Sequence, residues 1–258
     1  MGETVLITGA SSGIGKEFAY EYARRNKNLI LTARSKDKLD KIKKEIEEKF
    51  SVDVEIFVKD LSKENSAIEL YRELKHNNLN VDILINNAGF GMSGEFHKTE
   101  FSGQHSQIIL NCLSLTDLTY LIIKGMAEKK KGEIINIAST AAFQPVPYMA
   151  VYGATKAFVL SFSEALYQEY KRYGIKITAV CPGATETNFF DTAGPVGFGK
   201  SRKTEEVVGT ALKALEQNKL YAVDGIKNYF VTLLSRFLTR KKTVQISGNI
   251  MKRSLDIL

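Results

Sequence analysis

The stretch VLITGASSGIG, residues 5–15, decides the fold. Its first half is a short apolar run rich in β-branched residues, and Gly9, Gly13 and Gly15 follow in a G-x-x-x-G-x-G spacing. This pattern predicts a strand, a tight turn and the start of a helix, because glycines permit the turn and close backbone approach. The helix N-terminus would attract a pyrophosphate. Glycine-rich turns also serve as plain connections, so the motif alone leaves both interpretations open.

A phosphate-binding loop of the G-x-x-x-x-G-K-[ST] kind does not fit the same stretch. Ala10 stands where the first glycine of that motif must be. Glu17 follows Lys16 where Ser or Thr should coordinate magnesium. The sequence therefore favours a dinucleotide over a nucleoside triphosphate with its metal ion.

The rest of the chain alternates between strand-like and helical patterns. Six further strands are expected at 29–34, 54–60, 82–89, 133–139, 176–183 and 220–225, and helices at 14–26, 37–50, 63–78, 105–130, 152–173 and 204–217. The strands lack the clean polar alternation of a half-exposed sheet, so both faces should be covered. The order predicts an α/β fold: a single doubly wound Rossmann domain with a seven-stranded parallel sheet and helices on both faces. We expect residues 1–225 to form the cofactor-binding and catalytic body, and 226–258 a basic amphipathic extension of it.

Composition and charge indicate the cellular compartment of the protein and the kinds of partner it binds. The chain has 258 residues, 44% hydrophobic and 25% charged, as is typical of soluble globular proteins. No run approaches about 18 uninterrupted apolar residues, the first residues enter a strand at once, and both cysteines lie in apolar elements. These features predict a cytoplasmic protein. The net charge of +7 comes from residues 225–255, and charges of both signs mix elsewhere, so we expect no nucleic-acid partner.

Polar residues at the predicted strand ends indicate the cofactor, because ligands of such sheets bind there. Arg34 lies 19 residues beyond Gly15, where an NAD-selective site would place an acid. A guanidinium suits the 2′-phosphate of NADP, and Lys38 could share it; a solvated arginine is the alternative. Asp60 could bind the adenine or cap the next helix. The run NNAG (86–89) offers carboxamides and a glycine near the cofactor, or a plain turn.

Tyr152 and Lys156 lie one helical turn apart on the same face, thirteen residues after a strand that ends at Ser139. Together with TGASSGIG, NNAG, Asn111 and PGATET (182–187), they make the chain resemble the short-chain dehydrogenase/reductase family over nearly its full length. The region ASTAAFQPVPYMAVYGATKA is most similar to bacterial oxidoreductases close to the ketoacyl and ketosteroid reductases.

The resemblance implies a role for each residue. Tyr152 would be the general acid, giving its proton to a carbonyl oxygen as hydride arrives from NADPH. Lys156 would bind the nicotinamide ribose and, with the nicotinamide charge, lower the tyrosine pKa from about 10 toward 7. Ser139 would hold the substrate oxygen, and Asn111 a proton-relaying water. The predicted cofactor-binding residues are Gly9, Ser11, Ser12, Gly13, Ile14, Gly15, Arg34, Lys38, Asp60, Leu61, Asn87, Ala88, Gly89, Tyr152, Lys156, Pro182, Gly183, Thr185 and Thr187.

No metal site is expected, because the three histidines are scattered and the cysteines, Cys112 and Cys181, lie 69 residues apart.

The alternative to an enzyme is a non-catalytic dinucleotide-sensing regulatory protein. Such a protein commonly lacks the tyrosine or the lysine, and this chain has the full set. We therefore expect hydride transfer between NADP(H) and a carbonyl compound or secondary alcohol.

The substrate side is predicted to be apolar. The segment 188–203 combines glycines with Phe189, Phe190 and Phe198, which favours a lid over a hydrophobic ketone or aldehyde; a disordered connector is the alternative. Four residues near the tyrosine also suggest an apolar pocket. They are Phe143, Pro145, Tyr148 and Met149.

The C-terminal segment 226–253 carries an apolar stripe at helical spacing. The stripe comprises Tyr229, Phe230, Leu233, Leu234, Phe237 and Leu238. Arg236, Arg240, Lys241 and Lys242 are expected at the end of this helix, where the dipole favours cations. The stripe could pack on the domain or on a second subunit of a homodimer or homotetramer, or lie on an anionic membrane surface.

Overall fold

The computed structural model describes residues 2–187, 189 and 201–255. Seven strands in this part of the chain form one parallel sheet in the order β3-β2-β1-β4-β5-β6-β7. The strands are β1 (Thr4–Thr8), β2 (Asn28–Ala33), β3 (Val54–Val58), β4 (Ile83–Asn86), β5 (Gly132–Ile137), β6 (Ile175–Cys181) and β7 (Tyr221–Val223). The predicted doubly wound α/β sheet is therefore confirmed.

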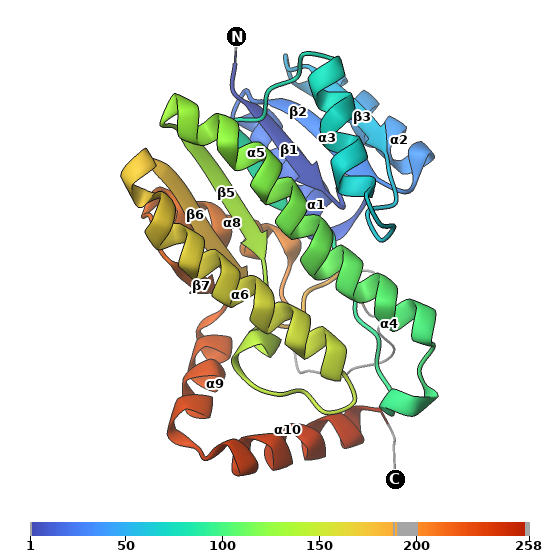
Figure 1. The fold of residues 1–258 in the computed structure, drawn as a ribbon, viewed down its shortest axis with the longest axis vertical. Helices are drawn as coiled ribbons and strands as arrows, with labels where there is room; N and C mark the ends of the chain where they lie inside the picture. The colour runs from blue at the N-terminus through green and yellow to red at the C-terminus, as the bar shows by residue number, and fades with distance from the viewer. Residues whose placement is uncertain (1, 188, 190–200, 256–258) are drawn as a thin grey trace.

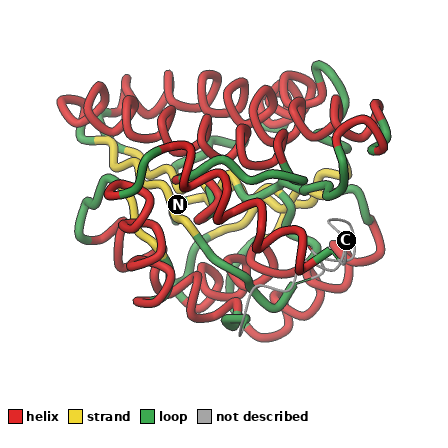
Figure 2. The backbone as a smooth tube through the Cα atoms, turned by 90° about the horizontal axis from the view of Figure 1, so that it is seen from below, coloured by secondary structure: helices red, strands yellow, loops and turns green. Residues whose placement is uncertain are grey.

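Helices cover both faces of the sheet, which lies between two helical layers (Figures 1 and 2). The α-helices are α1 (Gly13–Arg24), α2 (Lys36–Lys49), α3 (Ser66–His76), α4 (Phe101–Ile108), α5 (Leu115–Lys129), α6 (Ala150–Tyr170), α8 (Thr204–Glu216), α9 (Ile226–Phe237) and α10 (Arg240–Ser254). Shorter turns are η1 (Phe96–Lys98), the π-helical η2 (Ile109–Ser114), η3 (Thr140–Phe143) and η4 (Lys171–Tyr173). α1, α2 and α8 pack on one face, and α3, α5 and α6 on the other.

The first strand shows why the strands read as continuous apolar runs. Successive side chains of a strand point to opposite faces of the sheet. Val5 and Ile7 pack with Phe18 of α1 in one core cluster. Leu6, between them, packs with Leu70 of α3 in the other cluster. All of these side chains are fully buried, so both faces of the strand require apolar residues.

The ends of β1 and β4 are tied together at the centre of the sheet. The Thr8 hydroxyl accepts hydrogen bonds from the backbone N–H groups of Asn87 (3.0 Å) and Ala88 (2.9 Å). The Asn87 carboxamide donates to the Thr8 carbonyl at 2.9 Å. β1 pairs with β2 on one side and with β4 on the other. The connections that follow β1 and β4 therefore run to opposite faces of the sheet and leave a crevice between them. The tie fixes the geometry of that crevice.

One helical run of the described residues, Phe101–Lys129, has the length and composition of a membrane span, with a mean hydropathy of 1.4. Half of the 18-residue window that gives this value is buried inside the protein. Leu118, Ile122 and Met126 of this run pack in the core cluster under β1 and β4. The run is accordingly a core helix covering the sheet. It also begins earlier than the predicted helix 105–130 and contains the π-helical turn η2.

The C-terminal segment forms two helices, and one sequence expectation about it is wrong. Arg240, Lys241 and Lys242 begin α10 and do not end the preceding helix. The backbone turns extended at Leu238, and the Thr239 hydroxyl accepts from the Lys242 N–H at 3.4 Å, which caps a new helix. Only Arg236 lies in the last turn of α9. α9 and α10 occupy one end of the molecule, with α10 lying across it (Figure 1).

Candidate active site

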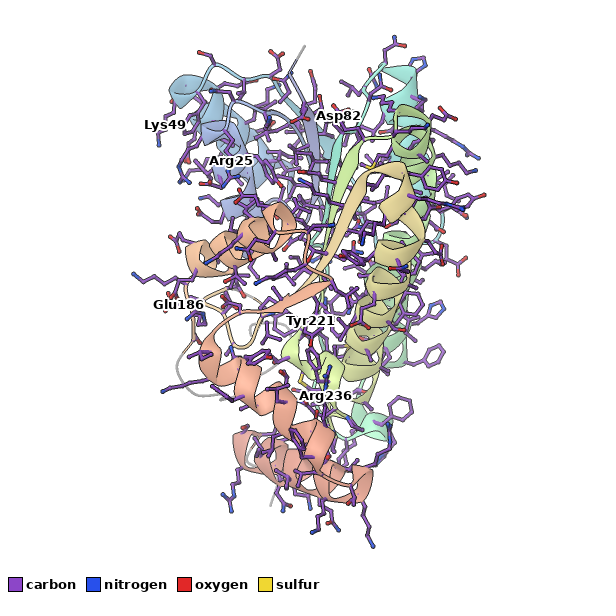
Figure 3. All side chains as sticks on the ribbon, turned by 90° about the vertical axis from the view of Figure 1, so that its left-hand side faces the viewer. Arg25, Lys49, Asp82, Glu186, Tyr221 and Arg236 are labelled. Atoms are coloured by element: carbon purple, nitrogen blue, oxygen red, sulfur yellow. The ribbon has the colours of Figure 1, made fainter. Side chains whose placement is uncertain are left out.

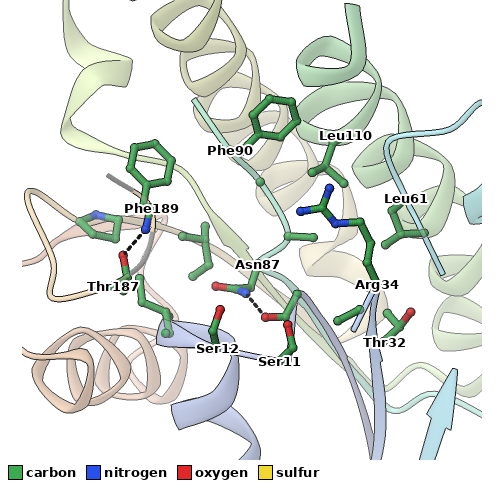
Figure 4. A pocket seen from close by; sticks show the side chains of 18 of the residues that line it. Ser11, Ser12, Thr32, Arg34, Leu61, Asn87, Phe90, Leu110, Thr187 and Phe189 are labelled. Atoms are coloured by element: carbon green, nitrogen blue, oxygen red, sulfur yellow. Dashed lines mark hydrogen bonds between the residues drawn. The ribbon is translucent and has the colours of Figure 1, made fainter. Parts of the chain in front are cut away.

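A cavity of about 500 Å³ lies at the carboxyl ends of the central strands (Figure 4). It is lined by most of the residues predicted to bind a cofactor: Gly9, Ser11, Ser12, Gly13, Ile14, Arg34, Lys38, Asp60, Leu61, Asn87, Ala88, Gly89, Tyr152, Lys156, Pro182, Gly183 and Thr187. Eight further residues line it that were not predicted from the sequence: Thr32, Ala33, Ser35, Lys59, Phe90, Leu110, Ile137 and Ala138. We call this cavity the cofactor cleft.

The glycine loop closes tightly under the cleft. A Cβ atom on Gly15 would lie 2.4 Å from the Gly9 carbonyl oxygen and 2.5 Å from the Asn87 side-chain nitrogen. Gly9 and Gly13 adopt left-handed backbone angles, with φ of +67° and +55°. Gly15 thus lies behind the loop and does not line the cleft. Ser12, the N-cap of α1, makes no side-chain cap hydrogen bond, which leaves first-turn N–H groups for an anion.

Arg34 extends from the end of β2 into the cleft toward Leu110, as Figure 4 shows. The arginine is exposed at this end of the cleft. Asp60 lines the same end, and its carboxylate accepts from the Ser62 N–H (3.1 Å) and hydroxyl (2.6 Å). Burial raises the pKa of Asp60, but these bonds and the Arg34 charge outweigh burial and lower it. Asp60 stabilises a local turn as well as facing the cleft.

The four predicted catalytic residues converge at the inner end of the cleft. Lys156 is buried and donates from Nζ to the Ile137 carbonyl at 2.7 Å. The same Nζ lies 5.9 Å from the ring centroid of Tyr152. A Cβ atom on Gly89 would lie 3.0 Å from Asn111 Oδ1 and 3.4 Å from Lys156 Nζ, so the amide and the amine flank one point.

Asn111 owes its position to the π-helical turn η2, which interrupts the run from α4 to α5. Its Nδ2 donates to the Phe90 carbonyl (2.9 Å) and to the Thr155 hydroxyl (3.0 Å), while Oδ1 accepts from the Phe90 N–H (3.2 Å). Turns of this kind are frequent at functional sites. The sequence predicted the helix but carried no signal for its irregular turn.

Burial dominates the electrostatics of Tyr152 and Lys156. It raises the pKa of Tyr152 to about 12, although a hydrogen bond with Ser139 lowers it in part. It lowers the pKa of Lys156 to about 8. The expectation that Lys156 lowers the pKa of Tyr152 is not met by the groups of the chain itself, because the amine is held at the Ile137 carbonyl, beside the tyrosine ring. At neutral pH the phenol keeps its proton.

Ser139 lies at the junction of the strand end and the next turn. Its hydroxyl accepts from the Ala141 N–H at 3.1 Å and lies 3.5 Å from the Pro182 carbonyl oxygen, to which it donates. It is the N-cap of η3, so two backbone segments fix its direction. The strand predicted at 133–139 ends earlier, at Ile137, so Ser139 lies two residues beyond β5.

A second cavity of about 500 Å³, the apolar pocket, opens from the same junction. It shares Ser139, Tyr152, Gly183, Thr187 and Phe189 with the cofactor cleft. Its remaining wall combines Thr140, Ala141, Gln144, Val146, Met149, Ala184 and Thr185 with Asn228, Val231, Leu234, Ser235, Leu238, Thr243, Ile246, Ser247 and Ile250. The contribution of α10 was not predicted, since the sequence suggested only one helix in this segment.

The residues proposed to form an apolar pocket divide between several places. Met149 lines the apolar pocket, and so does Thr185, which was predicted to bind the cofactor. Phe143 packs on Tyr221, with ring centroids 5.7 Å apart. Tyr148 lines a separate cavity beside η1. Pro145 is exposed at the surface.

The predicted lid 188–203 lies mostly outside the described residues, which include only Phe189 and 201–203 of it. The Phe189 ring packs on the Tyr152 ring, with centroids 5.3 Å apart. Among the described residues, no three His, Cys, Asp or Glu side chains form a group that could hold a metal ion. Cys112 and Cys181 are free thiols, and burial raises the pKa of each.

The comparisons with known proteins agree with this geometry. A very-long-chain 3-oxoacyl-CoA reductase of Bos taurus is 36% identical over 216 residues, 78% of this chain and 67% of that protein. The Rattus norvegicus protein of the same name is 32% identical over 99% of this chain and 83% of its own length.

Solved structures are similar as well. A short-chain dehydrogenase from Sphingobium yanoikuyae in complex with NADPH superposes with a TM-score of 0.83 at 35% identity, covering 91% of this chain and 93% of that one. A bulky-bulky ketone specific alcohol dehydrogenase from Comamonas testosteroni gives 0.78 at 33% identity, covering 91% and 92%. A family model described as short chain dehydrogenase matches residues 3–195. The chain belongs to the short-chain dehydrogenase family, oxidoreductases that act on CH–OH and C=O groups.

Proposed function

We propose that the chain transfers a hydride between NADP(H) and a hydrophobic ketone, aldehyde or secondary alcohol, with Tyr152 as the general acid and base. One observation carries the proposal: the cofactor cleft and the apolar pocket meet at Ser139 and Tyr152. A carbonyl group that reaches this junction from the apolar pocket would lie beside both hydroxyls. A nicotinamide in the cleft would face the same point.

The cofactor cleft fits a dinucleotide phosphate. A Cβ on Gly9, Gly13 or Gly15 would meet neighbouring atoms within 3 Å, so only glycines keep this cradle open. The start of α1 and its free N–H groups would hold the pyrophosphate. Arg34 and Lys38 would hold the 2′-phosphate. The NADPH in the Sphingobium yanoikuyae relative supports this assignment.

Bound NADPH supplies the hydride, and the chain supplies the proton and the binding of the oxygen. Tyr152, with its raised pKa, is protonated at neutral pH and can donate to the more basic alkoxide that forms on reduction. The Ser139 hydroxyl would donate to the same oxygen and stabilise its developing charge. Lys156, with a pKa near 8, can gain and lose a proton at working pH and so restore the proton of Tyr152. Asn111 Oδ1, beside that amine, would orient the relaying water.

The apolar pocket indicates the substrate class. Val146, Met149 and Phe189 form its near wall, and aliphatic side chains of α9 and α10 its far wall. Large ligands bury most of their surface in pockets of this size and composition. The names of the relatives, a very-long-chain 3-oxoacyl-CoA reductase and a dehydrogenase specific for bulky-bulky ketones, support a large apolar ketone.

We also propose a cytoplasmic homo-oligomer. The exposed face formed by α4, η2, α5 and α6, which we call the α4–α6 face, carries large apolar side chains: Phe101, Ile108, Leu113, Tyr120 and Phe158. A patch of this kind on a soluble protein commonly marks a protein interface. The two free thiols suit a reducing compartment.

A panel of aldehydes, diketones, 3-oxoacyl thioesters and ketosteroids tests the proposal, with NADPH absorbance as the readout. We expect turnover of large apolar ketones by the unmodified chain. Tyr152→Phe should lower kcat by about 10²–10⁴-fold and leave the NADPH Kd unchanged, because only the proton donor is removed. Tyr148→Phe, four residues earlier and outside both cavities, is the matched control and should keep full turnover.

Two outcomes would contradict the proposal. Near-normal turnover of Tyr152→Phe would remove the tyrosine from the chemistry. Tight NADPH binding without turnover of any panel member would support the non-catalytic dinucleotide-sensing role.

A further inference from the structure

We propose that the α9–α10 segment, residues 226–254, lies on an anionic lipid surface and admits apolar substrate from the lipid into the apolar pocket. The substrate part of this inference rests on the proposed function, whereas the lipid contact does not. Three features carry it: exposed apolar side chains on α9, basic residues that form no salt bridge among the described residues, and the part of the pocket wall that this segment forms.

The outer side of α9 is strongly apolar. Ile226, Phe230 and Phe237 are 68%, 62% and 84% exposed. Their spacing of four and seven residues places them on one side of the helix. Val231 and Leu234, on the adjacent side, line the apolar pocket and are still 59% and 55% exposed. A continuous apolar surface therefore leads from the outside of the helix to the pocket.

The charge of the segment is of one sign. Residues 225–255 hold seven basic residues and no acid, and the remaining 29 basic residues equal the 29 acidic ones. The seven are Lys227, Arg236, Arg240, Lys241, Lys242, Lys252 and Arg253, all of them exposed. Within the described residues none of them forms a salt bridge. The segment thus complements anionic headgroups.

The position of the segment suits a flat surface. α10 lies across one end of the molecule, next to α9, as Figures 1 and 3 show. Lys242, Ile246 and Arg253 recur at spacings that place them on one side of α10. Ile246 also lines the apolar pocket. Basic side chains at headgroup level beside apolar ones in the lipid are typical of interfacial helices.

A second copy of the chain is the less favourable occupant. A two-fold interface places the same patch of both subunits face to face, so seven basic residues would meet seven. The α4–α6 face has no such imbalance: Asp117 and Glu128 accompany Lys124 and Lys129 on α5. We therefore assign self-association to the α4–α6 face and lipid contact to α9 and α10.

Co-sedimentation of the full chain with vesicles tests the contact. One set consists of phosphatidylcholine alone and the other also contains phosphatidylserine. We expect binding to the anionic set that weakens as salt is added. Lys242→Glu with Arg253→Glu should lower the partition coefficient roughly tenfold or more. Lys41→Glu with Lys44→Glu on α2, two residues that are also exposed, is the matched charge control and should change it little.

A second pair of variants links the contact to the substrate. Phe230→Ser with Phe237→Ser should lower turnover of a long apolar ketone supplied in the vesicles and leave turnover of a short soluble ketone unchanged. Both side chains are exposed, so the variants should fold. Phe101→Ser on α4 is the apolar control and should not affect vesicle binding.

The outcomes separate this inference from the proposed function. If the full chain ignores anionic vesicles at low salt, or the α9 pair changes the oligomer mass and not vesicle binding, the lipid contact is overturned. Vesicle binding without turnover of any ketone would leave the contact standing and count against the proposed function. Loss of both ketone activities in the α9 pair would overturn substrate entry from the lipid.

Discussion

The cofactor cleft and the apolar pocket share Ser139 and Tyr152 but are built in different ways. The cleft is formed by strand ends, backbone and glycines, with no room for even one added carbon at Gly15. The far wall of the pocket includes aliphatic side chains of α9 and α10 that stay about half exposed. A fixed backbone can bind one cofactor, whereas the proposed substrate would contact side chains. Those side chains can be substituted at little cost to stability.

The two regions also differ in how firmly they are held to the rest of the protein. Near the cleft, Thr8 and Asn87 join the two central strands through several hydrogen bonds. The C-terminal segment is held at its start by the buried Asp224, which accepts from Arg202 and Thr210. Further on, α10 buries only Thr243 and Met251, and Met251 packs in a small cluster beside the pocket. Substitutions should therefore have unequal consequences in the two regions.

The largest expected difference concerns cofactor choice. The unmodified enzyme should prefer NADPH to NADH, and Arg34→Asp should erase or reverse this preference. A hydrogen bond to a charged group contributes about 1.5–3 kcal/mol, which corresponds to roughly 10- to 150-fold in relative kcat/KM. Lys38 lines the same end of the cleft, so a single change could give the low end of that range.

Lys36→Asp is the matched control for cofactor choice. Lys36 is exposed, pairs with Asp40 and does not line the cleft. Its replacement should leave the preference unchanged. Equal use of NADPH and NADH by the unmodified enzyme would remove Arg34 from cofactor recognition.

A smaller effect on the free energy of unfolding should distinguish a glycine with close neighbours from one with free space around it. Gly15→Ala should lower the free energy of unfolding by about 1–3 kcal/mol, because its Cβ would overlap the Gly9 carbonyl and the Asn87 amide. Gly209→Ala, inside α8 with nothing within 4 Å of its Cβ, should raise it by roughly 0.5–1 kcal/mol. Urea denaturation measures both. Changes of equal sign and size would show that the loop relaxes around an added carbon.

Much of the cleft could be predicted because local sequence determines it. The glycine spacing, the buried strands and the residues at the strand ends are properties of short segments, and the parallel order places their ends at one edge. Tyr152 and Lys156 follow from helical spacing. Their pKa values could not be predicted, because they depend on burial and on the Ile137 carbonyl that holds the amine.

The apolar pocket was harder to predict for a physical reason. The stripe on α9 is apolar over a wide arc, and the sequence does not state which part faces the body. The end of α9 depends on a two-residue break at Leu238 and Thr239, without a glycine or a proline to mark it. α10 is mostly polar, so its role in the pocket rests on a few side chains such as Ile246 and Ile250.

The smallest expected effect lies in that pocket and sharpens the contrast with the cleft. In lipid-free buffer, Leu234→Ala should lower kcat/KM for a long apolar ketone by roughly threefold to tenfold and leave a short ketone unchanged. Each buried methylene contributes about 0.8 kcal/mol, and we expect only a long substrate to reach Leu234 on the far wall. Stability should change by no more than about 0.5 kcal/mol, since the side chain is half exposed.

Phe237→Ala provides the control for this last prediction. Phe237 is on the same helix but does not line the pocket, so both ketones should be turned over normally without lipid. If Leu234→Ala lowered the activity on both ketones together, the side chain would act through the position of Ser139 and Tyr152. The far wall would then be part of the catalytic framework, and the distinction between a fixed cleft and an adaptable pocket would fail.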